Sequence, residues 1–382
     1  MRVNQQEAHK MKYSEFYKSM VRNAIAMRQP FTGSFELTPR CNLHCKMCYV
    51  CSQDAASREL STDQWIEMGR QASKAGVLFL LLTGGEIFMR KDFFEIYDAL
   101  INMGFIITLY TNGTLLNDEI IQRLSEAPPY LVSITVYGAS PDTYGKITGH
   151  PEAYEKVVNN VRKLIDAGIN TELKTTAIQY NKDEYPQLAE LAWSMNLVMR
   201  IVNYISPRRE GSGTDPLGNR LSPLELLDYE IKATESLKKL YKNDDNQEEI
   251  KKEDIVEDVM TGDFDKSIVQ KADETAPKSA FRCAAGKYGF WLTYDGRMTP
   301  CGLIGDIYSD ALNMGFIDAW NDITNKCAGV SISQDCYNCS YYSKCMVCPA
   351  RTKLETGGYE KAPTYICEYV KARDALLVSH KV

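Results

Sequence analysis

No apolar run in this 382-residue sequence is long enough to span a membrane. The longest, from Val77 to Leu82, falls far short of the roughly 20 residues that a membrane helix needs. The N-terminus also lacks the apolar segment of a signal peptide, which predicts a cytoplasmic protein. An excess of basic charge is absent too: the net charge is −6 at pH 7, which argues against broad nucleic-acid binding. We therefore expect neither a membrane nor a nucleic acid as a partner.

Cysteine is missing from the whole middle of the chain, residues 52–282, although the sequence contains 12 cysteines. The thiols therefore form two groups near the two ends of the sequence. Thiols clustered in this way in a cytoplasmic chain favour metal binding over disulfide formation. The first group is Cys41, Cys45, Cys48 and Cys51, and the second is Cys283, Cys301, Cys327, Cys336, Cys339, Cys345, Cys348 and Cys367.

Short apolar runs alternate with helical patterns between about residues 34 and 204, which predicts an α/β fold. Strands are expected at 34–38, 78–83, 106–110, 131–136, 171–178 and 199–204. Helices are expected between them at 63–75, 93–103, 118–125, 153–167 and 185–195. Such alternation implies a parallel sheet with right-handed crossovers, and six units make a partial, TIM-like (β/α)6 barrel. Ligands collect at the carboxyl ends of the strands in such folds.

The same patterns divide the chain into four segments. Residues 1–33 are expected to form an N-terminal helical extension, 34–215 the partial barrel, 216–280 a helical, acidic connector, and 281–382 a loop-rich, cysteine-rich domain. The connector contains a capping box from Ser222 to Glu225, followed by an acidic stretch at 244–274. A hairpin is expected in the last domain around the turn at Asp295 and Gly296.

The spacing of Cys41, Cys45 and Cys48 is C-x3-C-x2-C, directly after the first strand. Thiolates this close can bind one soft metal centre. Three thiolates leave one iron of a [4Fe–4S] cluster without a protein ligand, and that iron can coordinate a substrate. Two alternatives stay open on spacing alone: Cys51 as a fourth ligand, and a zinc-binding or incidental set of cysteines.

Over residues 33–210 the sequence resembles the radical S-adenosylmethionine (SAM) superfamily. The resemblance implies that Cys41, Cys45 and Cys48 bind the catalytic cluster. They are followed by Tyr49, as is usual in the family. Gly84-Gly85-Glu86 after the second strand matches the family motif for the amino group of SAM, and Thr111-Asn112-Gly113 after the third strand is also familiar there. Glycines let the backbone approach a ligand closely, and Glu86 offers an acceptor to an ammonium group.

The resemblance extends to three further contacts with SAM. Ser133 on the fourth strand is expected to reach the ribose or carboxylate, and Lys174 stands where relatives carry a basic residue facing the carboxylate. Ile205, after the sixth strand, is a candidate for packing against adenine. Ala153 departs from the family pattern, because relatives often have serine near this position.

The second cysteine group contains a C-x2-C-x5-C-x2-C array, Cys336 to Cys348, which by itself is typical of a zinc site. Seven cysteines are, however, too many for one tetrahedral ion and too few for two closed four-thiolate sites. The whole pattern is similar to the seven-cysteine SPASM domain of radical SAM enzymes, which holds two auxiliary [4Fe–4S] clusters. The family spacing between the fifth and sixth cysteines is x3, whereas this chain has x2.

This second resemblance implies a ligand set for each auxiliary cluster. Cluster I then lacks a fourth ligand unless Cys327 supplies it. Without Cys327, an open iron would bind a substrate thiolate, and the cysteine count favours this alternative. The implied ligands are Cys283, Cys301 and Cys348 for cluster I, and Cys336, Cys339, Cys345 and Cys367 for cluster II.

Taken together, the resemblances imply a radical SAM enzyme with three [4Fe–4S] clusters and SAM as cofactors. Such an enzyme cleaves SAM reductively to a 5′-deoxyadenosyl radical, which abstracts hydrogen from the substrate. A ribosomally made peptide is the expected substrate, and a Cys thioether cross-link is the expected product. A flavodoxin- or ferredoxin-type protein would supply the electron. Because residues 1–33 are too few for a leader-binding winged helix, a separate leader-peptide-binding protein is a candidate partner.

Other activities remain as alternatives. Within the family these are C–C cross-linking, dehydrogenation, sulfatase-type oxidation of Cys or Ser, and a small-molecule substrate. Outside it, the chain would be a zinc-binding module or a non-catalytic iron–sulfur electron carrier. A pure carrier has no use for the Gly84-Gly85-Glu86 motif.

Overall fold

The computed structural model describes residues 13–50, 58–208, 217–242 and 280–379, and these contain one nine-stranded sheet. Its order is β6-β5-β4-β3-β2-β1-β7-β8-β9. Neighbours from β6 to β7 pair in parallel, and β8 and β9 add antiparallel strands at one edge. The strands are β1 (Thr32–Glu36), β2 (Phe79–Thr83), β3 (Ile106–Thr111), β4 (Leu131–Thr135), β5 (Thr171–Thr176), β6 (Met199–Val202), β7 (Gly289–Leu292), β8 (Arg297–Thr299) and β9 (Ser309–Asp310).

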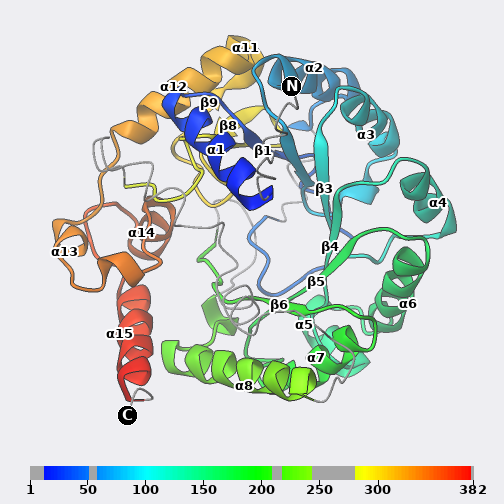
Figure 1. The fold of residues 1–382 in the computed structure, drawn as a ribbon, viewed down its shortest axis with the longest axis vertical. Coiled ribbons are helices and arrows are strands. Elements are labelled where there is room, and N and C mark those ends of the chain that lie inside the picture. Colours follow the sequence, from blue (N-terminus) through cyan, green and yellow to red (C-terminus); the bar gives the residue numbers. More distant parts are fainter. Residues whose placement is uncertain (1–12, 51–57, 209–216, 243–279, 380–382) are drawn as a thin grey trace, which may run out of the picture.

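Helices follow the outer side of the curved sheet (Figure 1). Those of the first part of the chain are α1 (Tyr13–Ala26), α2 (Thr62–Lys74), α3 (Phe93–Asn102), α4 (Asp118–Glu126), α5 (Pro141–Thr148), α6 (Ala153–Asp166), α7 (Tyr185–Trp193) and α8 (Pro223–Lys242), with short 3-10 turns η2 (Ile87–Met89) and η3 (Leu217–Asn219). The C-terminal part adds α11 (Ala311–Met314), α12 (Phe316–Ala328), α13 (Gln334–Tyr337), η4 (Tyr342–Lys344), α14 (Pro349–Thr356) and α15 (Thr364–Ser379). Strands inside and helices outside are the arrangement of a partial TIM-like barrel, as predicted.

The six strands expected from the sequence are confirmed as β1 to β6, with ends that differ by one or two residues. Strand β5 ends at Thr176 because Ile178 instead forms an isolated bridge with Arg220. Helix α5 was not expected. It begins with Pro141 after the N-cap Ser140, whose hydroxyl accepts a hydrogen bond from the Thr143 N–H. That start signal is readable in the sequence.

Strand β7 joins the cysteine-rich C-terminal part of the chain to the barrel. It pairs in parallel with β1, from Thr32 opposite Gly289 to Phe35 opposite Leu292. The hairpin predicted around Asp295 and Gly296 is confirmed as β7 and β8, and Gly296 supplies the positive φ of +84° that its turn requires. The pairing of this hairpin with the first strand was not predicted.

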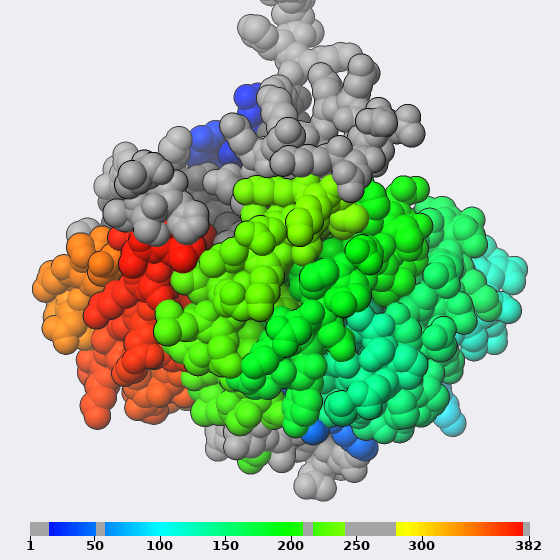
Figure 2. All heavy atoms as spheres, turned by 90° about the horizontal axis from the view of Figure 1, so that it is seen from below, coloured from blue at the N-terminus to red at the C-terminus, as the bar shows by residue number. Residues whose placement is uncertain are grey.

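The core is continuous across this junction. Phe35 of β1 packs against Trp65 with ring centroids 5.0 Å apart, and Phe290 of β7 packs against Phe316 of α12 at the same distance. Burying one such side chain stabilises the fold by about 1.5–3 kcal/mol. Helix α15 also packs beside α8, and the two lie next to each other in Figure 2. The barrel and the C-terminal part therefore share their apolar contacts.

The capping box predicted at the start of α8 is confirmed. The Ser222 N–H donates to Glu225 at 2.9 Å, and the Glu225 N–H donates to the Ser222 hydroxyl at 3.3 Å. The acidic stretch at 244–274 and Cys51 lie outside the described residues. Among the described residues, no helix combines the length and the apolar character needed to cross a bilayer.

Candidate functional site

A cavity of about 920 Å³ lies along the inner face and carboxyl ends of the parallel strands. The cysteine triad, Cys41, Cys45 and Cys48, lines this cavity. So do all but one of the other residues that the sequence nominates as SAM contacts, namely Tyr49, Gly84, Gly85, Asn112, Ser133, Lys174 and Ile205. The exception is Glu86. The fold thus brings together residues that are up to 164 positions apart in the sequence, from Cys41 to Ile205.

The loop that follows β1 presents its side chains alternately to the protein and to solvent. Cys45 is buried, whereas His44 and Lys46 are exposed. The backbone N–H groups of His44 and Lys46 donate to the carbonyls of Thr148 and Ile147 at 3.1 and 3.0 Å. The end of α5 therefore fixes the loop and turns the buried sulfur toward the cavity.

The three sulfurs of this loop lie close to one another. Burial, and then the negative charges of Cys48 and Cys41, raise the pKa of the Cys45 thiol well above its usual range. The Asn112 amide lies 3.6 Å from the Cys41 sulfur, and it also donates to Asn42 at 3.0 Å. A bound cation or cluster would relieve the cost of placing several thiolates together in a buried site.

In the described part of the chain, no three Cys, His, Asp or Glu side chains converge on the position of a single metal ion. Four ligands of one zinc ion, each about 2.3 Å from the metal, must lie about 3.8 Å apart. Ligands of a four-iron cluster bind different irons, so their sulfurs lie farther apart. Three thiolates on one loop suit such a cluster when one of its irons is left without a protein ligand.

Gly84 and Gly85 lie where two loops cross. A β-carbon on Gly84 would lie 2.4 Å from the Thr38 carbonyl oxygen, and one on Gly85 would lie 2.2 Å from that of Arg40. The Gly85 N–H donates to the Thr38 oxygen at 2.7 Å. Only glycine permits this approach, which positions the loop after β2 against the start of the cysteine loop.

The Glu86 carboxylate points into the protein rather than lining the cavity. It accepts hydrogen bonds from the backbone N–H of Asn112 at 2.7 Å, the Thr111 hydroxyl at 2.8 Å and the Phe88 N–H at 3.2 Å. The side chain is fully buried, and burial raises the pKa of Glu86 to about 7, although these three hydrogen bonds act to lower it. Glu86 therefore ties the loop after β2 to the loop after β3.

Ser133 and Lys174 both contact a residue that the sequence did not single out, Glu172. The Ser133 hydroxyl donates to Glu172 at 2.9 Å, and the Lys174 ammonium pairs with it at 3.1 Å. Arg200 of β6 binds the other carboxylate oxygen at 2.6 Å. Glu172 and Lys174 are two residues apart on β5 and so share one face of the strand, a signal present in the sequence.

The cysteines assigned to auxiliary cluster I lie near one another. Burial, followed by the charges of Cys348 and Cys283, raises the pKa of Cys301 to about 12. The sulfur of Cys327 lies against the turn that follows Cys283, since a β-carbon on Gly286 would be 2.5 Å from it. Burial and the charge of Cys283 raise the pKa of Cys327 to about 12.

The cysteines assigned to auxiliary cluster II form a second neighbourhood. Burial raises the pKa of Cys336 to about 11, and Cys367, Cys345 and Cys339 contribute in that order. Arg282, which the sequence analysis missed, holds this region: it donates to the carbonyls of Tyr342 at 2.6 Å and Cys345. No disulfide joins any two of the eleven described cysteines.

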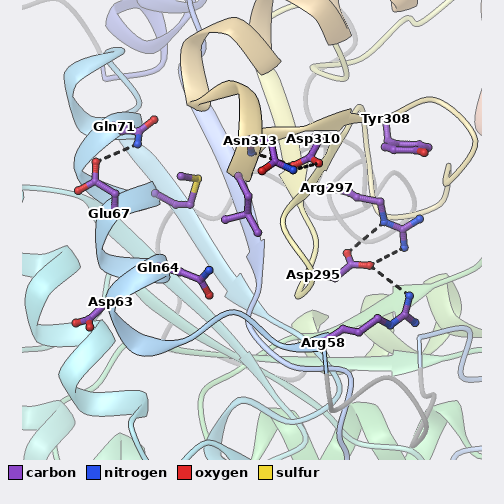
Figure 3. Close-up of a pocket in the computed structure, with 12 residues that line it drawn as sticks. Arg58, Asp63, Gln64, Glu67, Gln71, Asp295, Arg297, Tyr308, Asp310 and Asn313 are labelled. Carbon is purple, nitrogen blue, oxygen red and sulfur yellow. Dashed lines mark hydrogen bonds and ion pairs between the residues drawn. The ribbon is translucent and has the colours of Figure 1, made fainter.

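A second cavity of about 810 Å³ lies between α2 and the segment from β8 to α11 (Figure 3). Several of its charged side chains form ion pairs or hydrogen bonds with other residues of the cavity wall. Asp295 pairs with Arg297 at 3.0 Å and with Arg58 at 3.9 Å, and the Gln71 amide donates to Glu67 at 3.0 Å. None of the residues nominated from the sequence lines it, so the chemistry is expected in the first cavity.

Residues 35–192 match the family model described as the radical SAM superfamily. The chain is 27% identical over 352 residues to the AdoMet-dependent heme synthase of Methanosarcina barkeri, covering 90% of this chain and 98% of that protein. It is 25% identical over 288 residues to the sporulation killing factor maturation protein SkfB of Bacillus subtilis, covering 74% of this chain and 64% of SkfB. The chain thus spans just under two thirds of SkfB.

Among solved structures, the fold is similar to that of Streptococcus suis SuiB bound to precursor peptide SuiA. The TM-score is 0.66 at 14% sequence identity, and the match covers 96% of this chain and 83% of SuiB. The likeness extends beyond the barrel, because it includes nearly the whole chain.

Proposed function

We propose that this chain is a radical SAM maturase of ribosomally made peptides, because residues 35–192 match the model of the radical SAM superfamily and SkfB is among the relatives. The chain is an enzyme of radical chemistry, and one [4Fe–4S] cluster and SAM belong to that family. The observation that carries the proposal is the juxtaposition of the cysteine triad with Gly84 and Gly85 on one cavity at the strand ends.

The residues around the cavity fit both cofactors. Cys41, Cys45 and Cys48 provide three soft ligands for a cluster, which leaves one iron for SAM. When bound, this pair supplies a 5′-deoxyadenosyl radical that takes a hydrogen atom from the substrate. The backbone at Gly84 and Gly85 would hold the amino group of SAM, and Glu86 would keep that loop in position through Asn112.

Other residues would orient the remaining parts of SAM. Lys174 would hold its carboxylate, with Ser133 beside it and Glu172 holding both side chains. Ile205 belongs to the same apolar cluster as Leu43 and Cys45, which suits an adenine ring beside the cysteine loop. Water would be kept from the radical by the apolar part of this wall.

Two auxiliary clusters would sit in the C-terminal part of the chain, for three in total. Cys336, Cys339, Cys345 and Cys367 would hold cluster II. For cluster I, the contact between Cys327 and the turn after Cys283 favours Cys327 as the fourth ligand, with Cys301 and Cys348 completing the set. The open-iron alternative, with a substrate thiolate as ligand, would require Cys327 to remain a buried thiol.

The names of the relatives support a peptide substrate. SkfB is a maturation protein of a sporulation killing factor, and SuiB has been solved with a precursor peptide. We propose a Cys thioether as the bond formed, a flavodoxin- or ferredoxin-type protein as the electron donor, and a separate protein as the binder of the leader peptide.

The test uses anaerobically reconstituted enzyme, a chemical reductant, SAM and the peptides encoded beside its gene. We expect 5′-deoxyadenosine together with a peptide that has lost two hydrogen atoms, and fragmentation that maps the link to a cysteine sulfur. Formation of 5′-deoxyadenosine with no modified peptide in any such mixture would contradict the peptide assignment while keeping the family chemistry.

A second candidate substrate is a tetrapyrrole. It is favoured by the match to the AdoMet-dependent heme synthase, which covers 98% of that protein, whereas the match to SkfB covers 64%. Incubating the same enzyme with a propionate-bearing haem precursor separates the two candidates. Conversion of the tetrapyrrole, with no change to any peptide, would assign the small-molecule reaction.

A further inference from the structure

Positive charge dominates the wall of the main cavity. Among the described residues that line it, cationic side chains outnumber carboxylates by five to one. The cations are Lys174, Arg200, Lys344, Arg351 and Arg373, and the carboxylate is Glu172. Two carboxylates are shared among three of these cations: Glu172 binds both Lys174 and Arg200, and Asp374 pairs with Lys344 at 2.7 Å. The other two arginines come from the C-terminal helices.

Arg351 of α14 is held in position without a counter-ion among the described residues. Its guanidinium lies 4.6 Å from the centre of the Tyr204 ring and donates to the Met346 carbonyl at 2.9 Å. The nearby Glu355 is already engaged, because it accepts from Tyr204 at 2.7 Å and pairs with Arg220 at 2.5 Å. The charge of Arg351 is therefore left for a ligand.

Arg373 of α15 likewise forms no ion pair within the described part of the chain. The carboxylate that acts on it at longer range is Glu230, which is 1% exposed. Both Glu230 oxygens accept from the Tyr369 hydroxyl, at 2.8 and 2.7 Å, and one also accepts from the Asn203 amide at 2.7 Å. Glu230 is thus satisfied by neutral donors, so among the described residues no carboxylate pairs with the Arg373 guanidinium on the cavity wall.

We propose that Arg351 and Arg373 bind carboxylate groups of the substrate. A guanidinium presents paired N–H donors that match a carboxylate in a bidentate geometry, and a half-buried site strengthens that contact. The site rests on the proposed function, since it requires the substrate to enter the cavity that holds SAM. The carboxylates belong either to acidic side chains of a peptide or to the propionates of a tetrapyrrole.

The test measures equilibrium binding of two probe pairs to the anaerobic holoenzyme with SAM bound. The first pair is a ten-residue Gly/Ser peptide with two glutamates and the same peptide with two glutamines. The second pair is mesoporphyrin and its dimethyl ester. In the wild type, we expect the acid of at least one pair to bind about tenfold more tightly than its neutral counterpart. The preferred pair identifies the source of the carboxylate.

Substitutions then locate the site. Arg351→Gln and Arg373→Gln should each weaken binding of the preferred acid about tenfold, while the neutral counterpart is unaffected. Arg351→Lys should recover only part of the loss, because lysine lacks the planar pair of donors. Arg123→Gln is the matched control: Arg123 also lies 4.6 Å from an aromatic ring, that of Phe94, but it is outside the cavity. Its probe affinities should equal those of the wild type.

Three results overturn the proposal. They are an absence of preference for either acid, unchanged acid binding in both glutamine variants, and a fall in SAM affinity alone, which would assign the arginines to the carboxylate of SAM. Iron content and thermal stability identify a variant that fails to fold, and Arg351→Lys then carries the test. SAM cleavage by the wild type is measured separately, so failure of the radical function is distinguishable from failure of this site.

Discussion

The indole nitrogen of Trp291 donates a hydrogen bond of 2.7 Å to a carboxylate oxygen of Glu36. The two residues are 255 positions apart, on β7 and at the end of β1. Trp291 also packs against Gly302, next to Cys301, where a β-carbon would lie 3.0 Å from the indole ring. One side chain therefore connects the first strand of the barrel to the loop of a proposed auxiliary-cluster ligand.

Replacing Trp291 with Phe should lower the stability of the enzyme. The change removes a hydrogen bond to a fully buried carboxylate, and we expect a loss of about 1–3 kcal/mol. A double-mutant cycle with Glu36→Gln, measured by anaerobic thermal or denaturant unfolding, isolates the contribution of the contact. A coupling energy near zero would show that the bond adds nothing to the junction between the two parts.

Replacing Cys41, Cys45 and Cys48 together with Ala should remove about four of about twelve irons and abolish SAM cleavage, because the triad is proposed to hold one cluster of three. Iron analysis and detection of 5′-deoxyadenosine provide the measurements. Cys51→Ala is the control, and it should keep both the full iron content and the cleavage of SAM. Cleavage of SAM by the triple variant at the wild-type rate is the outcome that contradicts the assignment.

Glu86→Ala should weaken SAM binding roughly tenfold to a hundredfold at unchanged iron content, because it removes the buried hydrogen bonds that position the loop proposed to hold SAM, and these contribute about 1.5–3 kcal/mol. The physical cause is release of the loop at Asn112 from the loop after β2. Equilibrium dialysis with SAM measures the effect. Glu225→Ala serves as the control, since Glu225 accepts a comparable backbone hydrogen bond from Ser222 outside the cavity. Equal affinities for the wild type and Glu86→Ala would refute the role.

Stability should also depend on pH through Glu86. Its pKa in the fold is about 7, above the ordinary value of 4.5, so the folded protein holds this proton more tightly than the unfolded chain. The stabilisation that the protonated Glu86 gives the fold is complete below pH 4.5, the unfolded pKa. It is lost as the pH rises toward 7, and the free energy of unfolding then falls by roughly 3 kcal/mol in total. Glu86→Gln should lack this slope between pH 4.5 and 7. Parallel stability profiles of the two proteins would exclude it.

Cys327→Ala distinguishes the two alternatives for auxiliary cluster I. We expect the variant to lose the iron of one cluster, because the Cys327 sulfur lies beside the turn after Cys283. Iron content and electron paramagnetic resonance of the reduced enzyme are the readouts. Full iron content, with a spectrum that changes when a Cys peptide but not its Ser analogue is added, would instead show an open iron that binds the substrate thiolate.

Local sequence signals were sufficient for the barrel strands and for several helix ends. Gly76, Gly104 and Gly168 follow the C-caps of α2, α3 and α6, and each has a positive φ, of +94°, +88° and +72°. Such signals depend on neighbours within a few residues, where backbone geometry and side-chain periodicity operate. The Cys41 to Cys48 spacing and the Gly-Gly-Glu sequence are local in the same sense.

Only the tertiary structure decided the contacts between distant segments. The pairing of β7 with β1, the inward turn of Glu86 and the position of Cys327 beside Gly286 depend on loops that meet after the sheet has formed. Periodicity specifies which face of a strand or helix is buried, but not which distant element covers it. The sequence by itself thus determined the strands of the barrel and the spacing of its cysteine loop, and the fold determined which distant side chains line the cavity beside that loop.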